Sequence, residues 1–260
     1  MVLNKSIPRL VKSIFRTRPF ADRTLCHFLR RRLTLPPLLL SDLFGDFDEQ
    51  PVTLRRIPRG SWSTPTQDIV MLLKLALCSK PKRILEIGSF RGYSALHLAQ
   101  NSESDAMIVT VDRYPEHGEA YRGAPEACRI ERRVGESAPA LFSQDAPASY
   151  DLIFIDADHT YEGVRRDTGL ALPLVAPAGY IAWHDYANWG YFNGYNGVPE
   201  YLRELSASLP VAHVLGSDLA IYSPAWAIKN GPARDRYLKA IGIASPGEIG
   251  SNPWNCTSLR

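Results

Sequence analysis

Acidic and imidazole side chains follow short apolar segments in the second half of this 260-residue chain. Asp156 ends one apolar run, His159 comes three residues later, and His184 and Asp185 together end another run. Two carboxylates offer oxygen ligands for a hard divalent cation, and His184 could add a nitrogen. We therefore predict Asp156, His184 and Asp185 as metal ligands. We predict His159 as the catalytic base, because histidine can accept a proton near neutral pH; the alternative is an ordinary turn residue.

A second group of residues surrounds the stretch 83–99, which begins as a short apolar strand, breaks at two glycines and continues with helix-like apolar spacing. Gly88 and Gly92 permit a tight turn and the close approach of a ligand to the backbone. Glu86 places an acid at the mouth of this turn, where it would repel a pyrophosphate and attract a cation. The stretch has neither the phosphate-loop pattern nor the three-glycine dinucleotide fingerprint. The ammonium and sulfonium of S-adenosylmethionine fit it better, although a merely well-packed turn is the alternative.

The ends of the next two predicted strands supply further polar groups. Asp112 lies 26 residues after Glu86, where a carboxylate can accept hydrogen bonds from a ribose diol, each contributing roughly 1.5–3 kcal/mol. Glu136 and Ser137 follow the third strand and would lie beside an adenine ring, unless they form an ordinary loop. The complete set of predicted cofactor-binding residues is Glu86, Gly88, Ser89, Gly92, Ser94, Asp112, Glu136, Ser137 and Asp156.

These residues require strands whose carboxyl ends meet at one edge of a sheet. Short apolar runs alternate with helical or looped connections from residue 83 onward, which predicts an α/β fold with a doubly wound, Rossmann-like sheet. The predicted strands number seven: 84–87, 107–111, 129–134, 152–155, 180–183, 211–215 and 219–222. Only Gly216, Ser217 and Asp218 separate the last two, so the mostly parallel sheet should have an antiparallel terminal strand. The spacing also predicts a helix over 67–78.

Charge and composition divide the chain into three parts. Residues 1–33 contain nine Lys or Arg against one acid, a net charge of +8, so the remainder of a chain with net charge +3 carries −5. We predict a basic N-terminal extension (1–60), a catalytic domain (61–224) and a tail (225–260). The extension could contact an anionic membrane surface peripherally, although a solvated segment is the alternative. We expect no nucleic-acid partner, and a homo-oligomer is compatible with the sequence.

The four cysteines are scattered, without metal-ligand or redox spacing, which favours a reducing compartment. No apolar run approaches the roughly 20 residues that span a bilayer, and charges interrupt the N-terminus every few residues, unlike a secretory signal. These observations predict a cytoplasmic protein without a transmembrane segment.

Four stretches carry a resemblance to a known family: Leu85-Glu86-Ile87-Gly88-Ser89-x-x-Gly92-Tyr93-Ser94, Val111-Asp112, Asp156-Ala157-Asp158-His159-x-Tyr161-Glu162, and His184-Asp185-Tyr186. On these residues the chain resembles the class I S-adenosylmethionine-dependent methyltransferases, and within them the metal-dependent O-methyltransferases of the macrocin (macrolide-sugar) and catechol types. The resemblance covers about residues 64–223. It implies Mg²⁺ at Asp156 and Asp185, His159 as base, Glu86 and Gly88 around the methionine part of the cofactor, and Asp112 at its ribose. At the position of His184 the family commonly has Glu, Asp or Asn.

The resemblance thus predicts a divalent-metal-assisted O-methyltransferase whose acceptor is the hydroxyl of a small molecule, a sugar or a glycosylated natural product. The stretch 186–201, rich in aromatic and amide side chains, would contact such an acceptor. Two other classes remain open: a non-catalytic S-adenosylmethionine-binding protein, and a metal-dependent relative resembling carbohydrate hydroxylases.

Overall fold

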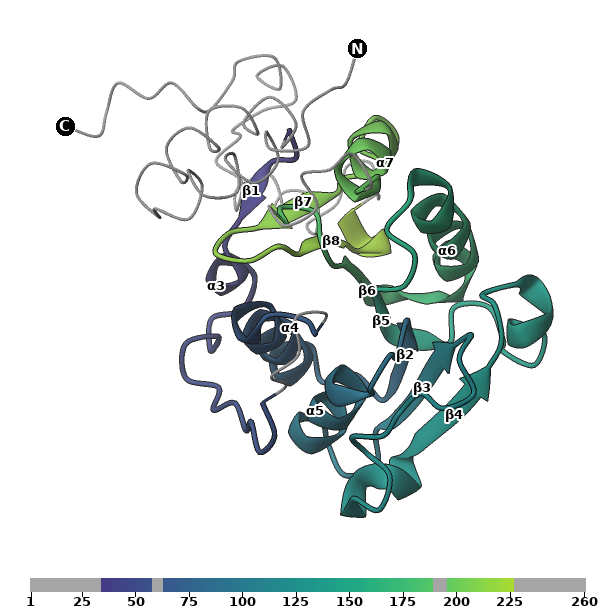
Figure 1. The fold of residues 1–260 in the computed structure, drawn as a ribbon. Coiled ribbons are helices and arrows are strands. Elements are labelled where there is room, and N and C mark those ends of the chain that lie inside the picture. Colours follow the sequence, from purple (N-terminus) through teal and green to yellow (C-terminus); the bar gives the residue numbers. More distant parts are fainter. Residues whose placement is uncertain (1–33, 58–62, 189–195, 227–260) are drawn as a thin grey trace, which may run out of the picture. The chain divides into compact units, whose positions relative to one another are not determined.

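One sheet runs through the part of the chain that the computed structural model describes, which is residues 34–57, 63–188 and 196–226 (Figure 1). The predictions for the basic segment 1–33, for residues 189–195 of the aromatic stretch and for the tail from 227 onward therefore lie outside the described residues. The strands are β1 (Pro37–Leu38), β2 (Arg83–Ile87), β3 (Met107–Asp112), β4 (Ile130–Val134), β5 (Tyr150–Ile155), β6 (Val175–Trp183), β7 (Ala212–Val214) and β8 (Ala220–Tyr222).

Helices connect these strands. The α-helices are α3 (Leu40–Leu43), α4 (Thr66–Ser79), α5 (Tyr93–Asn101), α6 (Tyr161–Leu174) and α7 (Val198–Leu205), and the 3₁₀ turns are η1 (Pro125–Arg129), η2 (Pro139–Phe142) and η4 (Pro224–Trp226). The helix predicted over 67–78 is confirmed as α4. No helix in the described ranges is long and apolar enough to cross a bilayer.

The strand order is β1-β7-β8-β6-β5-β2-β3-β4. Strands β2 to β6 pair in parallel, whereas β8 is antiparallel to both β6 and β7. The predicted Rossmann-like sheet with an antiparallel last strand is therefore confirmed. Because β2 lies between β3 and β5, the direction of winding reverses at β2, which is where ligands bind in sheets of this kind.

The predicted number of seven strands is wrong, because β1 adds an eighth. Pro37 and Leu38 pair in parallel with His213 and Val214 of β7. A strand of two residues is too short to show an alternating pattern in the sequence. The prolines before Leu38 are also more typical of an irregular segment than of a strand. Proline is tolerated here because β1 is an edge strand. The compact unit that contains the sheet begins at Leu35, so part of the segment that we placed in the extension contributes to the sheet.

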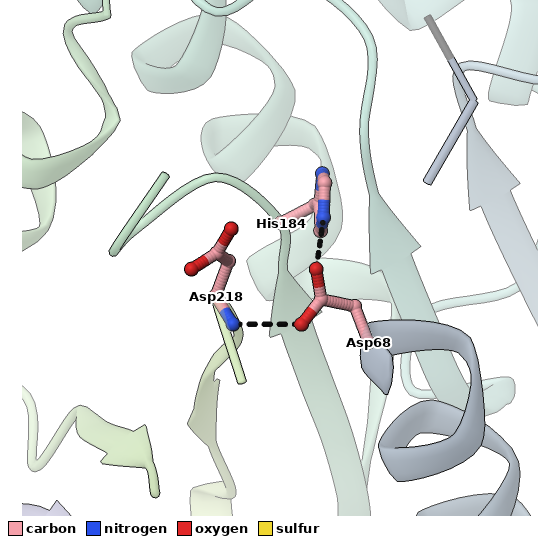
Figure 2. A group of neighbouring side chains, drawn as sticks. All are labelled: Asp68, His184 and Asp218. Atoms are coloured by element: carbon pink, nitrogen blue, oxygen red, sulfur yellow. Dashed lines mark hydrogen bonds and ion pairs between the residues drawn. The ribbon is translucent and has the colours of Figure 1, made fainter. Parts of the chain in front are cut away.

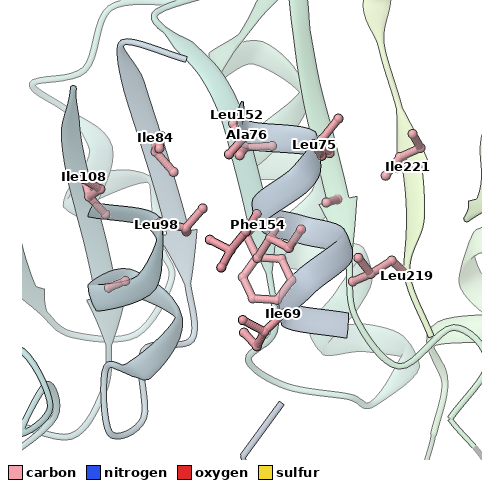
Figure 3. Packing of buried hydrophobic residues seen from close by; sticks show 14 of the residues in the cluster. Ile69, Leu75, Ala76, Ile84, Leu98, Ile108, Leu152, Phe154, Leu219 and Ile221 are labelled. Atoms are coloured by element: carbon pink, nitrogen blue, oxygen red, sulfur yellow. The ribbon is translucent and has the colours of Figure 1, made fainter. Parts of the chain in front are cut away.

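Helices cover both faces of the sheet. On one face, α4 and α5 contact each other and pack on alternate strand residues, among them Ile84, Leu152 and Phe154 (Figure 3). On the other face, α6 contacts β5, β6 and α7. Because both faces are covered, the central strands β2, β3 and β5 are buried along almost their whole length rather than at alternate residues, and they are apolar apart from a few positions such as Glu86 and Thr110.

The turn from β2 into α5 depends on a glycine. Gly88 has a φ of +102°, and a Cβ at this position would lie 2.1 Å from the backbone oxygen of Asp156. Around it, the Gly88 N–H donates to the Val111 carbonyl at 2.9 Å and the Asp156 N–H to the Ile87 carbonyl at 2.9 Å. The carboxyl ends of β2, β3 and β5 are thereby held together at the point where the winding reverses.

We expect Gly88→Ala to lower the free energy of unfolding by about 3 kcal/mol or more, because the methyl group would overlap backbone in a left-handed conformation. The control is Gly169→Ala in α6, where nothing lies within 4 Å of an added Cβ. Alanine in that helix interior should stabilise by about 0.5–1 kcal/mol. Urea denaturation measures both changes, and equal effects of the two substitutions would contradict the close approach.

Candidate active site

A cavity of about 460 Å³ lies at the carboxyl ends of β2, β3, β4 and β5. The turns that follow these strands contribute most of its wall. It brings together most of the residues predicted to bind the cofactor, namely Gly88, Ser89, Ser94, Asp112, Glu136, Ser137 and Asp156. Glu86 and Gly92 are not among its lining residues, and His159 is. Residues from four separate strand ends thus surround one space.

Glu86 lies deeper than we expected. Its side chain is fully buried rather than placed at the mouth of the turn. One carboxylate oxygen accepts a hydrogen bond from the Ser94 hydroxyl and the other from the Thr110 hydroxyl. Burial raises the pKa of Glu86 to about 7, even though these hydrogen bonds act in the opposite direction. Since Ser94 lines the cavity, Glu86 supports the cavity wall from behind.

Asp112 is fixed at the cavity by the backbone. Its carboxylate accepts hydrogen bonds from the Phe90 N–H at 2.7 Å and from the Tyr114 N–H at 2.9 Å. Each carboxylate oxygen has a second lone pair, so a diol can still bind. Asp112 therefore retains hydrogen-bond acceptors at the cavity, and its contact with ribose stays a prediction.

The predicted adenine-side residues differ in their surroundings. The Ser137 hydroxyl donates to Asp167 and accepts from Nε of Arg166 at 3.2 Å, so α6 holds it in place. Glu136 is more exposed, and its carboxylate lies 3.9 Å from the Arg113 guanidinium. Ser137 therefore has the more fixed orientation of the two.

The four residues predicted to act on the acceptor converge beside the cavity. Nε2 of His159 lies 3.2 Å from Oδ1 of Asp156 and 2.8 Å from Oδ2 of Asp185. Nδ1 of His184 lies 3.2 Å from Oδ1 of Asp156 and 3.1 Å from Oδ1 of Asp185. The sequence separates Asp156 and Asp185 by 29 positions, and the parallel pairing of β5 with β6 brings them to one edge.

Local structure fixes the orientation of two of these residues. His159 immediately precedes Thr160, whose hydroxyl caps α6 by accepting from the Gly163 N–H at 3.1 Å. Asp185 has a left-handed backbone, with φ of 61°. The Asn196 side chain donates to its carbonyl at 2.7 Å, and Asn188 donates to its carboxylate. A sparsely populated conformation held by its surroundings is common at functional sites.

The electrostatics of this cluster are dominated by its carboxylates. Burial alone would lower the pKa of His159, but hydrogen bonds to Asp156 and Asp185 outweigh it and raise that pKa to about 10. The pKa of His184 is likewise well above its ordinary value, against the effect of burial, because Asp156, Asp185 and Asp68 surround the ring. Burial would raise the pKa of both Asp156 and Asp185, yet the two imidazoles hold both values below the usual range.

The donor set fits a divalent cation. Asp156, His184 and Asp185 each offer one ligand atom, and these atoms lie within 4.8 Å of one another. The buried carboxylate of Asp185 and the partly buried one of Asp156 lie near one point and favour a bound cation, because each would otherwise need a positive partner. In the described residues the imidazoles supply that charge, and a cation would take over the same role.

Sequence reasoning missed two contacts to this cluster. Nε2 of His184 lies 3.0 Å from Oδ2 of Asp68, a buried residue in the first turn of α4 (Figure 2). The Thr64 hydroxyl donates to Oδ2 of Asp156 at 3.0 Å. The one feature of the sequence that could have indicated these contacts is Asp68 itself, an acid near Ile69 and Leu72 at the start of an otherwise apolar helix face. By itself that pattern also suits a helix N-terminus.

Three kinds of comparison place this chain among known proteins. A family model described as a methyltransferase domain matches residues 85–186. A protein of Mycobacterium sp. (strain KMS) that is named as an O-methyltransferase by inference is 30% identical over 177 residues. The match covers 64% of this chain and 80% of the relative. A similarly named protein of Mycobacterium avium is 32% identical over 130 residues, 46% of this chain and 55% of the relative. This chain spans about half the length of most of these relatives. For the O-methyltransferase relative from Mycobacterium tuberculosis, the match covers 47% of the relative's length.

Solved structures show the same fold. The O-methyltransferase TomG from Streptomyces achromogenes, in complex with S-adenosylmethionine, superposes with a TM-score of 0.53 at 22% identity, covering 70% of this chain and 96% of TomG. The Podospora anserina methyltransferase PaMTH1, bound to S-adenosylhomocysteine, superposes with a TM-score of 0.51 at 21% identity, covering 80% and 96%.

The buried Glu86 generates a pH-dependent prediction. The pKa of Glu86 is near 4.5 in the unfolded chain and about 7 in the folded protein. Burial of the ionised carboxylate therefore lowers the free energy of unfolding, by an amount that grows from about pH 4.5 to about pH 7 and is constant at higher pH. At ~1.36 kcal/mol per pH unit the full cost is about 3 kcal/mol. Glu86→Gln should therefore raise the free energy of unfolding at pH 8 by up to about that amount and leave it nearly unchanged at pH 4.5.

Denaturant unfolding of Glu86→Gln at the two pH values measures this effect. The control is Glu162→Gln, whose side chain is 76% exposed and which should show no such difference. A gain for Glu86→Gln that is equal at both pH values would contradict the raised pKa.

Proposed function

Because the chain belongs to the class I S-adenosylmethionine-dependent O-methyltransferases, we propose that it methylates a hydroxyl group of a small molecule. The observation that carries this proposal is the position of Asp156, which lines the cofactor cavity and also contacts His159. An acceptor beside His159 would therefore lie next to the cofactor cavity. Holding two reactants in line in this way can contribute roughly 7–11 kcal/mol.

The cofactor and the cation would bind different residues except at Asp156, which lies beside both. Asp112 would hold the ribose of S-adenosylmethionine, Ser94 and the Gly88 turn its methionine part, and Ser137 its adenine. Asp156, His184 and Asp185 would hold a divalent cation, for which the family resemblance implies Mg²⁺. When bound, the cofactor supplies the methyl group, and the cation supplies positive charge that lowers the pKa of a nearby hydroxyl and of the His159 imidazole.

His159 would receive the proton of the acceptor hydroxyl at Nε2. A hydroxyl with a pKa not far below ~15.7 and an imidazole near ~6.5 differ by roughly 8–9 pH units, or about 11–12 kcal/mol. Proton transfer to His159 alone does not bridge this gap. With both aspartates uncompensated, moreover, the pKa of about 10 keeps His159 protonated at neutral pH. We therefore propose that base and cation are both needed.

The acceptor that we propose is a sugar or a glycosylated natural product. The support within the described residues is the pair Asn188 and Asn196, which belong to the stretch 186–201 and donate hydrogen bonds to Asp185. Amide and aromatic side chains together suit the polar edges and apolar faces of sugar rings. A cytoplasmic location, a homo-oligomer and a peripheral contact through residues 1–33 remain predictions.

His159→Gln should lower turnover by roughly 10²–10⁴-fold, the usual contribution of a general base. Cofactor affinity, measured by calorimetry with S-adenosylmethionine, should stay within about twofold, since His159 belongs to the acceptor side of the site. The control is Arg165→Ala, an exposed residue of α6, which should keep turnover. Normal turnover of His159→Gln would remove it as the base, and the absence of cofactor binding by the unchanged protein would refute the proposed function.

Removal of divalent cations with EDTA should reduce methyl transfer by roughly 100-fold or more, because charge stabilisation by the cation would be lost. Binding of S-adenosylmethionine should persist. Adding back a cation should restore the rate, as measured by release of S-adenosylhomocysteine. Methyl transfer that continues unchanged after chelation would contradict the cation site while leaving the transferase proposal intact.

A further inference from the structure

His184 lies between two sets of carboxylates. Its Nδ1 faces Asp156 and Asp185, at 3.2 and 3.1 Å. On the other side of the ring, its Nε2 faces Asp68 at 3.0 Å (Figure 2). The side chains of His184 and Asp68 are both buried, at 5% and 4% exposed. The ring therefore has one orientation, and each nitrogen has a defined neighbour.

Asp68 is itself fixed in place. Its Oδ1 accepts a hydrogen bond from the backbone N–H of Asp218 at 2.8 Å, while Oδ2 lies against His184. A backbone N–H can only donate, so Asp68 must present an oxygen to Asp218. As a carboxylate, Asp68 has a second oxygen for the His184 side. It therefore accepts the Nε2–H of His184, and Nδ1 is the nitrogen that remains on the side of Asp156 and Asp185.

We propose that Asp68 is a positioning residue that holds His184 as an Nδ1 ligand, and that the resulting site prefers a first-row transition cation to Mg²⁺. This proposal rests on the proposed function only in taking Asp156 and Asp185 as cation ligands. Mg²⁺ favours oxygen ligands, whereas imidazole favours transition cations. A carboxylate behind a ligating histidine fixes its tautomer and increases its basicity. The chain thus differs from the all-oxygen sites implied by the family resemblance.

Asp68→Asn separates this role from a purely structural one. An asparagine has a single side-chain oxygen, which the Asp218 N–H would occupy. Its NH₂ group would then face His184 and donate to Nε2, which forces the imidazole proton onto Nδ1. The ring would keep its place and its packing, but the nitrogen facing Asp156 and Asp185 would no longer be a ligand. The expected effect is a loss of cation selectivity in a folded protein.

Two further variants provide controls. Asp218→Asn removes one negative charge from the same neighbourhood, since Asp218 lies beside Asp68 and His184. The contact of Asp218 with Asp68 uses the backbone N–H, which this substitution retains. His184→Glu replaces the nitrogen donor with oxygen and defines the selectivity of an all-oxygen site.

The test is the ratio of the Mg²⁺ and Co²⁺ dissociation constants, measured by calorimetry on the full chain without cofactor or acceptor. Relative to the unchanged protein, Asp68→Asn and His184→Glu should each lower this preference for Co²⁺ by roughly 10–100-fold, and Asp218→Asn should leave it within about threefold. The proposal would be overturned if Asp68→Asn had the same preference for Co²⁺ as the unchanged protein. It would also be overturned if the unchanged protein had the same preference as His184→Glu.

A second measurement needs no variant. In long-range ¹H–¹⁵N NMR spectra of the unchanged protein, Zn²⁺ should shift the His184 Nδ1 resonance while Nε2 stays protonated. A shift at Nε2, or none at His184, would overturn the proposal. Because both measurements omit the acceptor, a failure of methyl transfer would not affect them. Conversely, an all-oxygen selectivity would leave the methyltransferase proposal standing.

Discussion

The close approach of two backbone turns is the constraint on which the site depends. Gly88, at the end of β2, leaves no space for a side chain against the backbone of Asp156, at the end of β5. The contact lies where the winding of the sheet reverses, so the cavity at the strand ends and the carboxylate cluster meet at Asp156. The apolar strands and the helices on both faces of the sheet serve to keep these two turns in contact.

Charge balance is the second determinant of the site. Asp156 and Asp185 each lie near both imidazoles, Asp68 lies near that of His184, and most of these groups are buried. Uncompensated carboxylates would be costly in such surroundings. The imidazoles therefore stabilise the cluster through their own positive charge, and under the proposed function they would give that charge up when a cation enters. The high pKa of His159 results from its contacts with these carboxylates, and its proposed use as a base would require a cation to lower that pKa.

Much of this arrangement could be predicted from local patterns. The apolar runs located β2 to β8, the three-residue connection predicted the hairpin of β7 and β8, and the acids at strand ends predicted one polar edge. The rest depended on contacts between distant segments. Asp68 lies 116 positions before its partner His184, β1 is too short to show a pattern, and the burial of Glu86 results from the docking of α5. Pairings of this kind are set by tertiary packing, which no window of sequence contains.

The shared position of Asp156 has a consequence for how this site can diverge in evolution. A change at Asp156 would alter the wall of the cavity and the carboxylate cluster together, so the proposed cofactor and cation sites would both constrain the same side chain. Asp68 and His184, by contrast, contact the cluster without lining the cavity. Under the proposed function, substitutions in that pair would change which cation binds while the fit to the cofactor is inherited unchanged.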